Sequence, residues 1–296
     1  MFNGDEKLNL IQKLIWLISN FINNIDLKKS SANYWKNLNI DSKKLSFLFS
    51  KTDDLSSPSR KICDMFWHNL PWNELSKIFG GKLNSIEIGC GPGRYGKKLE
   101  KLIKNFSYLG CDIKSYPEWK LRTNKKITFK KMSSDQVLDV IDKKNFIFTQ
   151  SAIEHFENDY LFLKNIQDYI NNSKKPFLQI HLLPSSFCLW KYLMHGYRQY
   201  SAIKIHQLYE KLWKKQNFIA LSLGGKNSNF VHLKYITLPM VLGKIDKRKL
   251  YEAKYKVESE NAIKHDLKLF NPKNASFYAL VIFSNITLSK KLFSQL

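Results

Sequence analysis

From about residue 81 onward, short apolar runs alternate with amphipathic stretches. The runs that predict strands are 84–89, 107–113, 126–132, 145–151 and 176–183. Between them, 94–105 and 159–172 have the spacing of helices. This alternation predicts a doubly wound, parallel α/β sheet covered by helices on both faces. Ligands of such sheets bind beyond the carboxyl ends of the strands.

The flanking segments complete the expected organisation. Residues 1–80 predict a mostly helical N-terminal extension, and 81–296 the ligand-binding domain. Two further strands are predicted at 218–223 and 276–284, which makes seven. The intervening segments 184–217 and 224–275 are too long for plain connections, so we expect inserts that cover or recognise a substrate.

Near the N-terminus, isoleucines recur at alternating four- and three-residue spacing, which predicts a helix with one apolar stripe. They are Ile11, Ile15, Ile18, Ile22 and Ile25. Such a stripe more often covers the protein's own core or a partner subunit than a membrane, so a homodimer through this helix is one expectation. No run reaches the roughly 18 to 20 apolar residues of a membrane-spanning helix, and no signal peptide is expected.

The chain has 48 Lys and Arg against 25 Asp and Glu, a net charge of +23. Nucleic acid is therefore a possible partner, but 43 of the basic residues are lysines dispersed along the chain. Nucleic-acid readers favour arginine, so a solvated basic surface is the preferred interpretation. The four cysteines form no CxxC pair, which predicts a reduced, cytoplasmic protein without a metal site.

The segment "SIEIGCGPGRYG" at 85–96 is the main chemical signal. It satisfies the GxGxxG pattern of dinucleotide sites, and Asp112 ends the second predicted strand, where a carboxylate can hold ribose hydroxyls. Two features favour S-adenosylmethionine instead. Glu87 lies inside the first strand, where it can hold the ammonium of an amino-acid-bearing cofactor. Pro92 removes a backbone N–H that a pyrophosphate would use.

A third feature is the end of the fourth strand, "FTQSAIEHF". With "IEIGCGPGRYG", "LGCDI" and "KKMSSDQV", it resembles the four ordered motifs of class I S-adenosylmethionine-dependent methyltransferases, of the small-molecule type with an "LEH"-like signature. The resemblance implies a Rossmann-like, seven-stranded, mostly parallel sheet with one antiparallel strand. The cofactor-binding residues that it implies are Glu87, Gly89, Cys90, Gly91, Gly93, Asp112, Ile113, Ser134, Asp135, Gln150 and Ser151.

The three acidic residues to which the resemblance assigns a binding role could instead have a purely structural role. Glu87 could be a salt-bridged strand residue, Asp112 a helix N-cap, and Asp135 the N-cap of a short helix. The sequence also departs from the family pattern twice. Asn145 stands where an acid is common, and "MSSDQ" lacks the glycine that often precedes the third-motif acid.

Four histidines are candidate catalytic bases, although methyl transfer can proceed by alignment alone: His155, His181, His195 and His232. We select His155 and His195. His155 follows the fourth strand, where the methyl group is expected, or it starts a helix and bonds to backbone. His195 lies in a cluster with Tyr197, Arg198 and Tyr200 that could hold a polar acceptor, or it belongs to a core-facing helix.

The acceptor is narrowed by exclusion. No NPPY-like tetrapeptide follows the fourth strand, and no cysteine stands where a C5-pyrimidine enzyme keeps its nucleophile. The extension and inserts are similar to those of bacterial methyltransferases of surface polysaccharides. We therefore expect O-methylation of a small molecule or glycan. The alternatives are an RNA methyltransferase, a non-catalytic protein of the same fold and, least favoured, an oxidoreductase.

Overall fold

The structure is a computed structural model that describes residues 2–25, 33–191, 195–243, 245–269, 272–288 and 292. The chain forms two compact units. Unit 1 comprises residues 1–70, 184–205 and 220–279, and unit 2 comprises residues 71–183, 206–219 and 280–296.

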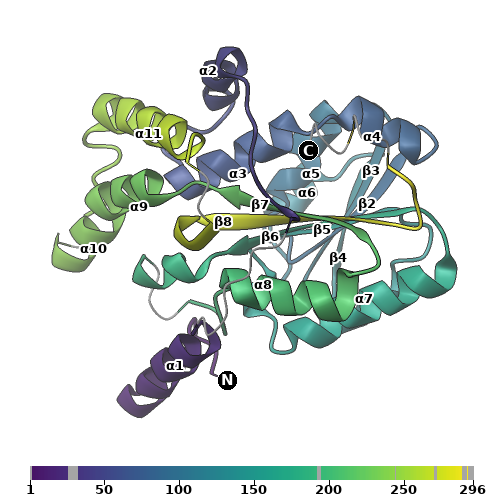
Figure 1. The fold of residues 1–296 in the computed structure, drawn as a ribbon, viewed down its shortest axis with the longest axis horizontal. Coiled ribbons are helices and arrows are strands. Elements are labelled where there is room, and N and C mark those ends of the chain that lie inside the picture. Colours follow the sequence, from purple (N-terminus) through teal and green to yellow (C-terminus); the bar gives the residue numbers. More distant parts are fainter. Residues whose placement is uncertain are drawn as a thin grey trace. The chain divides into compact units, whose positions relative to one another are not determined.

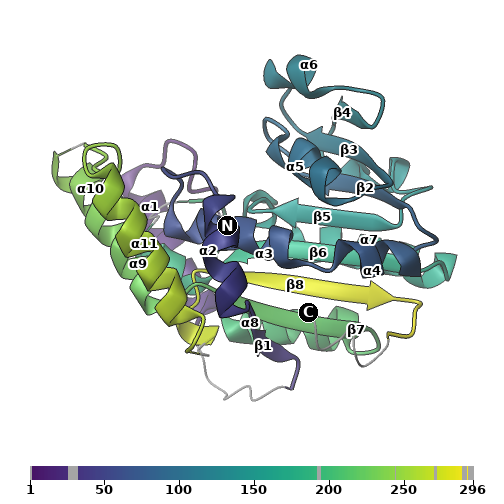
Figure 2. The same cartoon turned by 90° about the horizontal axis from the view of Figure 1, so that it is seen from above.

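The strands form an eight-stranded sheet with the order β1-β7-β8-β6-β5-β2-β3-β4. Their bounds are β1 Trp35–Asn37, β2 Leu83–Ile88, β3 Phe106–Asp112, β4 Ile127–Lys131, β5 Phe146–Gln150, β6 Phe177–Pro184, β7 Asn217–Leu223 and β8 Phe277–Ser284. The pairs β1·β7, β2·β3, β2·β5, β3·β4 and β5·β6 are parallel. Figure 2 shows β8 pointing opposite to β5. The expected Rossmann-like, mostly parallel sheet with one antiparallel strand is confirmed.

One strand was not expected from the sequence. The seven predicted strands are all present, and β1 is an addition within the segment predicted to be mostly helical. It pairs in parallel with residues 220–222 of β7, so it extends the sheet on the side of unit 1.

Unit 2 contains the predicted alternation of strands and helices. Helices α4 (Trp72–Ile78) and α5 (Arg94–Leu102) cover one face of its strands, and α7 (Asp159–Ser173) covers the other (Figure 1). Short helices α6 (Glu118–Arg122), η1 (Ser134–Asp139) and η2 (Ile153–His155) follow strands β3, β4 and β5. Strands β5 and β6 are buried throughout, as expected for strands covered on both faces.

Unit 1 is mainly helical. It holds α1 (Leu10–Asn23), α2 (Ser42–Ser50), α3 (Pro58–Asn69), η3 (Ser186–Trp190), α9 (Lys226–His232), η5 (Leu233–Thr237), α10 (Leu238–Gly243), α11 (Glu252–Asp266) and η6 (Pro272–Asn274). Helices α8 (Ala202–Leu208) and η4 (Tyr209–Trp213) precede β7. The two segments predicted as inserts are therefore built mainly from helices, which irregular stretches such as 195–201 and 245–250 connect.

Candidate cofactor site

The glycine loop joins β2 to α5 within unit 2. Gly89, Gly91 and Gly93 all have left-handed backbone, with φ of 75°, 51° and 78°. A Cβ at residue 89 would overlap the Cβ of Ala152, which follows β5. Around Gly91, by contrast, a Cβ would meet no atom within 4 Å. Glycine is thus required at 89 for close approach and at all three positions for the turn.

The loop lies where the strand order reverses, because β2 has β3 on one side and β5 on the other. This is the position at which open α/β sheets bind ligands. The amides of Gly89 and Cys90 donate to the Cys111 carbonyl at 2.8 and 3.0 Å. The amide of Gly91 donates to the Asp112 carboxylate at 2.8 Å. The first half of the loop is thereby fastened to β3.

The second half of the loop also has no free backbone amide donor for a ligand. Gly93 donates to the Cys90 carbonyl at 2.9 Å, and Pro92 has no N–H. Trp119 donates from its ring nitrogen to the Gly91 carbonyl at 2.8 Å. Residues 89–93 therefore offer no free amide to an anionic ligand, so the donors that a pyrophosphate needs would have to come from the first turn of α5, which has no side-chain cap.

Glu87 lies beneath the loop, 1% exposed, with the Tyr108 hydroxyl 2.5 Å from its carboxylate. Burial raises the pKa of Glu87 to about 8, against the partial opposing effect of the Tyr108 hydrogen bond, and the charge of Asp112 adds to the rise. Burial also raises the pKa of Cys90, with Glu87 and Asp112 contributing. The charge of Asp112, and a proton that Glu87 can release when a cation binds beside it, both suit a cationic ligand at this end of the sheet.

Asp112 ends β3 and accepts two backbone amides. One oxygen accepts from Gly91, and the other accepts from Lys114 at 3.1 Å. A carboxylate oxygen has two lone pairs, so both oxygens retain capacity for ribose hydroxyls. The neighbouring Ile113 side chain is 63% exposed, an apolar surface that a flat aromatic ring would cover.

Ser134 and Asp135 open η1, but the cap of this helix is Ser133. The Ser133 hydroxyl accepts from the Asp135 amide at 3.4 Å, and the Ser133 amide donates to the Gln136 side chain at 3.1 Å. The alternative role of Asp135 as the N-cap is therefore wrong. Its carboxylate is exposed to solvent.

At the end of β5, Gln150 is buried and Ser151 has a left-handed backbone with φ of 53°. Such backbone in a residue other than glycine is strained and is concentrated at functional sites. The Ser151 hydroxyl donates to Glu154 at 2.7 Å, and the Glu154 carboxylate lies 3.8 Å from Nε2 of His155. Glu154 is fully buried, whereas the His155 side chain is 31% exposed. The structure thus brings together Ser151, a buried carboxylate and a half-exposed imidazole.

His155 also shows part of its structural alternative, since its amide donates to the Ala152 carbonyl at 2.9 Å within η2. Two other histidines are unsuited to proton transfer. His181 and His232 are buried, and burial lowers the pKa of each to about 3. They remain neutral across the physiological range.

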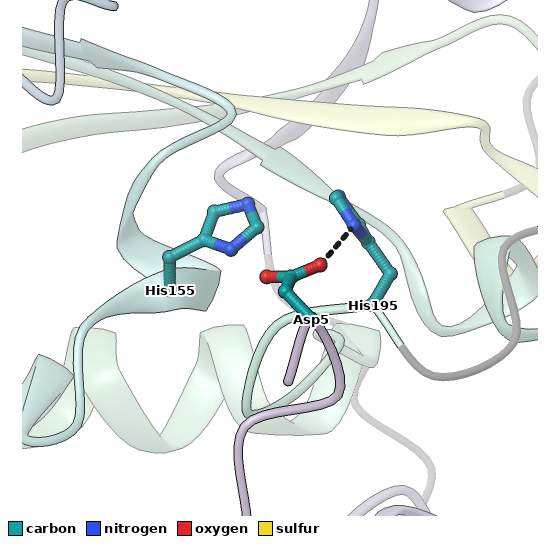
Figure 3. A group of neighbouring side chains, drawn as sticks. All are labelled: Asp5, His155 and His195. Carbon is teal, nitrogen blue, oxygen red and sulfur yellow. Dashed lines mark hydrogen bonds and ion pairs between the residues drawn. The ribbon is translucent and has the colours of Figure 1, made fainter. Parts of the chain in front are cut away.

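His195 lies in unit 1, in a segment that forms hydrogen bonds with residues near the N-terminus. Its ring is 3.0 Å from the Asp5 carboxylate (Figure 3), and the other Asp5 oxygen accepts from the Gly196 amide at 3.2 Å. The Gly4 amide donates to the Gly196 carbonyl at 2.7 Å. No pattern in the sequence indicates the Asp5–His195 pair, whose members are 190 residues apart.

Sequence reasoning missed the aromatic residues that support the loop. Tyr108 holds Glu87, and Trp119 holds the Gly91 carbonyl and stacks on Phe129 with ring centroids 5.1 Å apart. The Phe129 ring in turn occupies the space that a Cβ at residue 93 would need. The available signal for Tyr108 was its place in the sequence, two residues before Gly110 in the strand that ends at Asp112. An aromatic residue at that place could equally have belonged to the core.

No protein-family model and no curated protein matches the sequence. Similar solved structures include the plantazolicin methyltransferase BamL in complex with a triazolic desmethylPZN analog and SAH, at 15% identity and a TM-score of 0.49 over 82% of this chain and 91% of that one. A SAM-dependent methyltransferase from Archaeoglobus fulgidus has 18% identity and a TM-score of 0.45 over 81% and 99%. Coclaurine N-methyltransferase bound to N-methylheliamine and SAH has 13% identity and a TM-score of 0.46 over 94% and 90%. Likeness at this level supports no inference about chemistry, which rests on the residues of the site.

Proposed function

We propose that the protein is an S-adenosylmethionine-dependent methyltransferase whose cofactor binds at the carboxyl ends of β2 and β3. The observation that carries this proposal is the combination of two carboxylates, Glu87 and Asp112, with a loop whose amides are all committed. This arrangement disfavours the pyrophosphate of a dinucleotide. It suits a ligand that carries a sulfonium and an ammonium and lacks phosphate.

The residues that would hold the cofactor follow from this placement. Glu87 would balance the ammonium, and Asp112 would accept the ribose hydroxyls with the oxygen lone pairs that Gly91 and Lys114 leave. The exposed Ile113 would cover the adenine, whose amino group would face Ser134 and Asp135. The loop residues Gly89, Cys90, Gly91 and Gly93 would line the methionine part, with Gln150 and Ser151 near the methyl group.

One observation favours the dinucleotide alternative. A Cβ at Gly96 would come within 2.8 Å of the Tyr108 ring, so this glycine allows α5 to approach β3 closely. The third glycine of the dinucleotide pattern has the same role. Close packing of a helix on a strand does not depend on which ligand binds, however. The loop amides bear on the ligand itself, because those of residues 89–91 and 93 already donate hydrogen bonds within the protein.

For the acceptor, we propose a hydroxyl of a small molecule or glycan. In-line transfer moves the methyl group from the sulfonium to the acceptor oxygen, and the proton of the hydroxyl needs a base. His155 is the proposed base within unit 2, with Glu154 stabilising the imidazolium that forms. His195, oriented by Asp5, is the second candidate. An RNA acceptor, favoured by the net charge of +23, is the alternative, and a non-catalytic protein of this fold is a further one.

The test is calorimetric titration of the purified protein with S-adenosylhomocysteine and with NAD. Asp112→Ala should weaken S-adenosylhomocysteine binding by about 1.5 to 3 kcal/mol, the contribution of hydrogen bonds to a charged group. Asp112→Asn retains an acceptor for the Gly91 amide, so it distinguishes loss of ribose contacts from collapse of the loop. Asp168→Ala, which removes an exposed carboxylate on α7, is the matched control.

Binding of NAD instead of S-adenosylhomocysteine, or of neither, contradicts the proposal. Transfer of a labelled methyl group to glycan or small-molecule acceptors then tests catalysis. Methylation of RNA oligomers without methylation of any such acceptor would establish the alternative acceptor class.

A further inference from the structure

Helix α1 has an unusual orientation within unit 1, because it buries its polar side. Gln12, Trp16, Asn20 and Asn24 recur every four residues, and Trp16 and Asn20 are fully buried. The Trp16 ring nitrogen donates to the Gly196 carbonyl at 2.8 Å. These buried residues face the segment that follows His195.

Asn20 fixes the rotation of the helix. Its side-chain amide donates to the Tyr197 carbonyl at 3.2 Å, and its side-chain oxygen accepts from the Gln199 amide at 3.2 Å. Both ends of this side chain are therefore bonded to backbone. With Trp16 bonded one turn earlier, the opposite side of α1 must face away from the segment 196–199.

That opposite side is apolar and exposed. Eight of the fourteen residues of α1 are large apolar residues with exposures between 39% and 84%. They are Leu10, Ile11, Leu14, Ile15, Leu17, Ile18, Phe21 and Ile22, and Ile25 continues the stripe beyond the helix. The expectation that the stripe covers the protein's own core is therefore wrong.

The width of this apolar face indicates what can cover it. At about 100° per residue, the eight side chains span roughly 160° of the helix circumference. A seam between two coiled-coil helices is narrower. A helix that lies in the plane of a bilayer interface inserts a continuous apolar face of this kind.

The same unit carries a second exposed apolar segment, and this one is basic. Leu238, Val241, Leu242 and Ile245 are each more than half exposed along α10 and the residues after it. Residues 234–256 contain seven Lys and Arg and two Asp and Glu. Three of these basic side chains form ion pairs, Lys234 with Glu258, Arg248 with Asp246 and Lys256 with Asp54, and the other lysines of the segment supply its excess positive charge. Both α1 and α10 lie toward the same end of unit 1 (Figures 1 and 2).

We propose that unit 1 binds the surface of an anionic lipid bilayer, with the apolar face of α1 inserted at the headgroup boundary. The basic segment 234–256 supplies the charge complementarity, and the apolar residues of α10 add to the inserted area. Helix α1 lies in the interface and does not cross it. Its 14 residues extend only about 21 Å, and among the described helices none combines the length and apolar character needed for a span.

The test is co-sedimentation of the full chain with phosphatidylcholine vesicles, with and without phosphatidylglycerol. We expect binding to the anionic vesicles that weakens at high salt. The variant Leu14→Gln with Ile18→Gln should lower the vesicle partition coefficient about tenfold or more, because it removes two inserted side chains. Glutamine favours helix more than isoleucine does and nearly as much as leucine, so α1 is retained.

The matched control is Phe47→Gln with Leu161→Gln, two exposed apolar residues of α2 and α7, which should bind like the wild type. Unfolding midpoints show whether the variants fold. If the variant Leu14→Gln with Ile18→Gln does not fold, the variant Leu10→Gln with Phe21→Gln takes its place. Absence of vesicle binding by the wild type, or unchanged binding by the α1 variant, overturns the proposal. Light scattering that finds a dimer which the α1 variant dissociates, without vesicle binding, assigns the face to a second copy of the chain.

Discussion

The raised pKa of Glu87 makes a quantitative prediction about the substitution Glu87→Gln. The Glu87 side chain is 1% exposed and bonded to the Tyr108 hydroxyl, and its pKa rises from 4.5 to about 8 on burial. Glutamine has nearly the same shape as the protonated acid and keeps an oxygen for Tyr108. The variant therefore removes the ionisation and leaves the packing.

The sign follows from proton binding. Between pH 4.5 and about 8 the folded protein holds a proton on Glu87 that the unfolded chain has released. The contribution of Glu87 to the free energy of unfolding is therefore fully present below pH 4.5. It is lost progressively as the pH rises from 4.5 to about 8. The loss is about 1.4 kcal/mol per pH unit, so a change from pH 5 to 7.5 costs the wild type on the order of 3 kcal/mol relative to the variant.

Urea denaturation of the wild type and Glu87→Gln at a series of pH values measures this difference. Glu74→Gln, an exposed carboxylate on α4, is the control and should follow the wild type at every pH. A stability difference between wild type and Glu87→Gln that is constant from pH 5 to 7.5 would refute the argument that burial of this carboxyl sets its pKa.

The same ionisation couples to the proposed cofactor. An ammonium beside Glu87 favours the carboxylate, so binding releases a proton and the affinity for S-adenosylhomocysteine rises up to about tenfold per pH unit below pH 8. In Glu87→Gln the affinity should be weaker and nearly independent of pH. Titrations in buffers of different ionisation enthalpy count the released protons, and equal proton release by the two proteins would contradict the placement of the ammonium.

Two further predictions concern the loop and the base. Gly91→Ala should destabilise the fold by about 1 to 2 kcal/mol, the cost of left-handed backbone in a residue with a Cβ. Gly89→Ala should lose more, because its Cβ would also overlap Ala152. Equal unfolding free energies for the two variants would exclude the close approach of Gly89 to Ala152. If His155 is the base, His155→Gln should lower kcat on a hydroxyl acceptor about 10²- to 10⁴-fold and remove the acidic limb of the kcat pH profile, with S-adenosylhomocysteine affinity unchanged. An unaltered pH profile would assign proton removal elsewhere.

The order of strands was predictable because periodicity and turn residues are local signals. The short strand β1 was not, since Trp35–Asn37 is three residues of intermediate burial without alternation. Its place is set by pairing with β7, almost two hundred residues later. In η1, similarly, Asp135 was the N-cap that the sequence suggested, and the hydrogen bonds show that Ser133 holds this position.

At the candidate site, the sequence predicted where Glu87 and Asp112 lie along the chain, and the structure shows which groups contact them. Both were available as candidates because each stands at a set distance from a glycine within its own strand-and-turn segment. Tyr108 was missed because its role depends on strand register. It pairs with Ser85, two residues before Glu87 and on the same face, so its hydroxyl reaches the carboxylate only once β2 and β3 are aligned.

Helix α1 shows the limit of periodicity most clearly. The spacing of its isoleucines predicts an apolar stripe correctly, but a stripe carries no information about which side of the helix the protein binds. That choice depends on whether the other side can satisfy its hydrogen bonds on the fold, and Trp16 and Asn20 do so through the backbone of 196–199. Because the polar side is anchored by specific bonds and the apolar side is left exposed, the apolar face is a surface for something outside the chain. Its continuous apolar area and the excess of lysines in segment 234–256 of the same unit favour an anionic bilayer as the occupant.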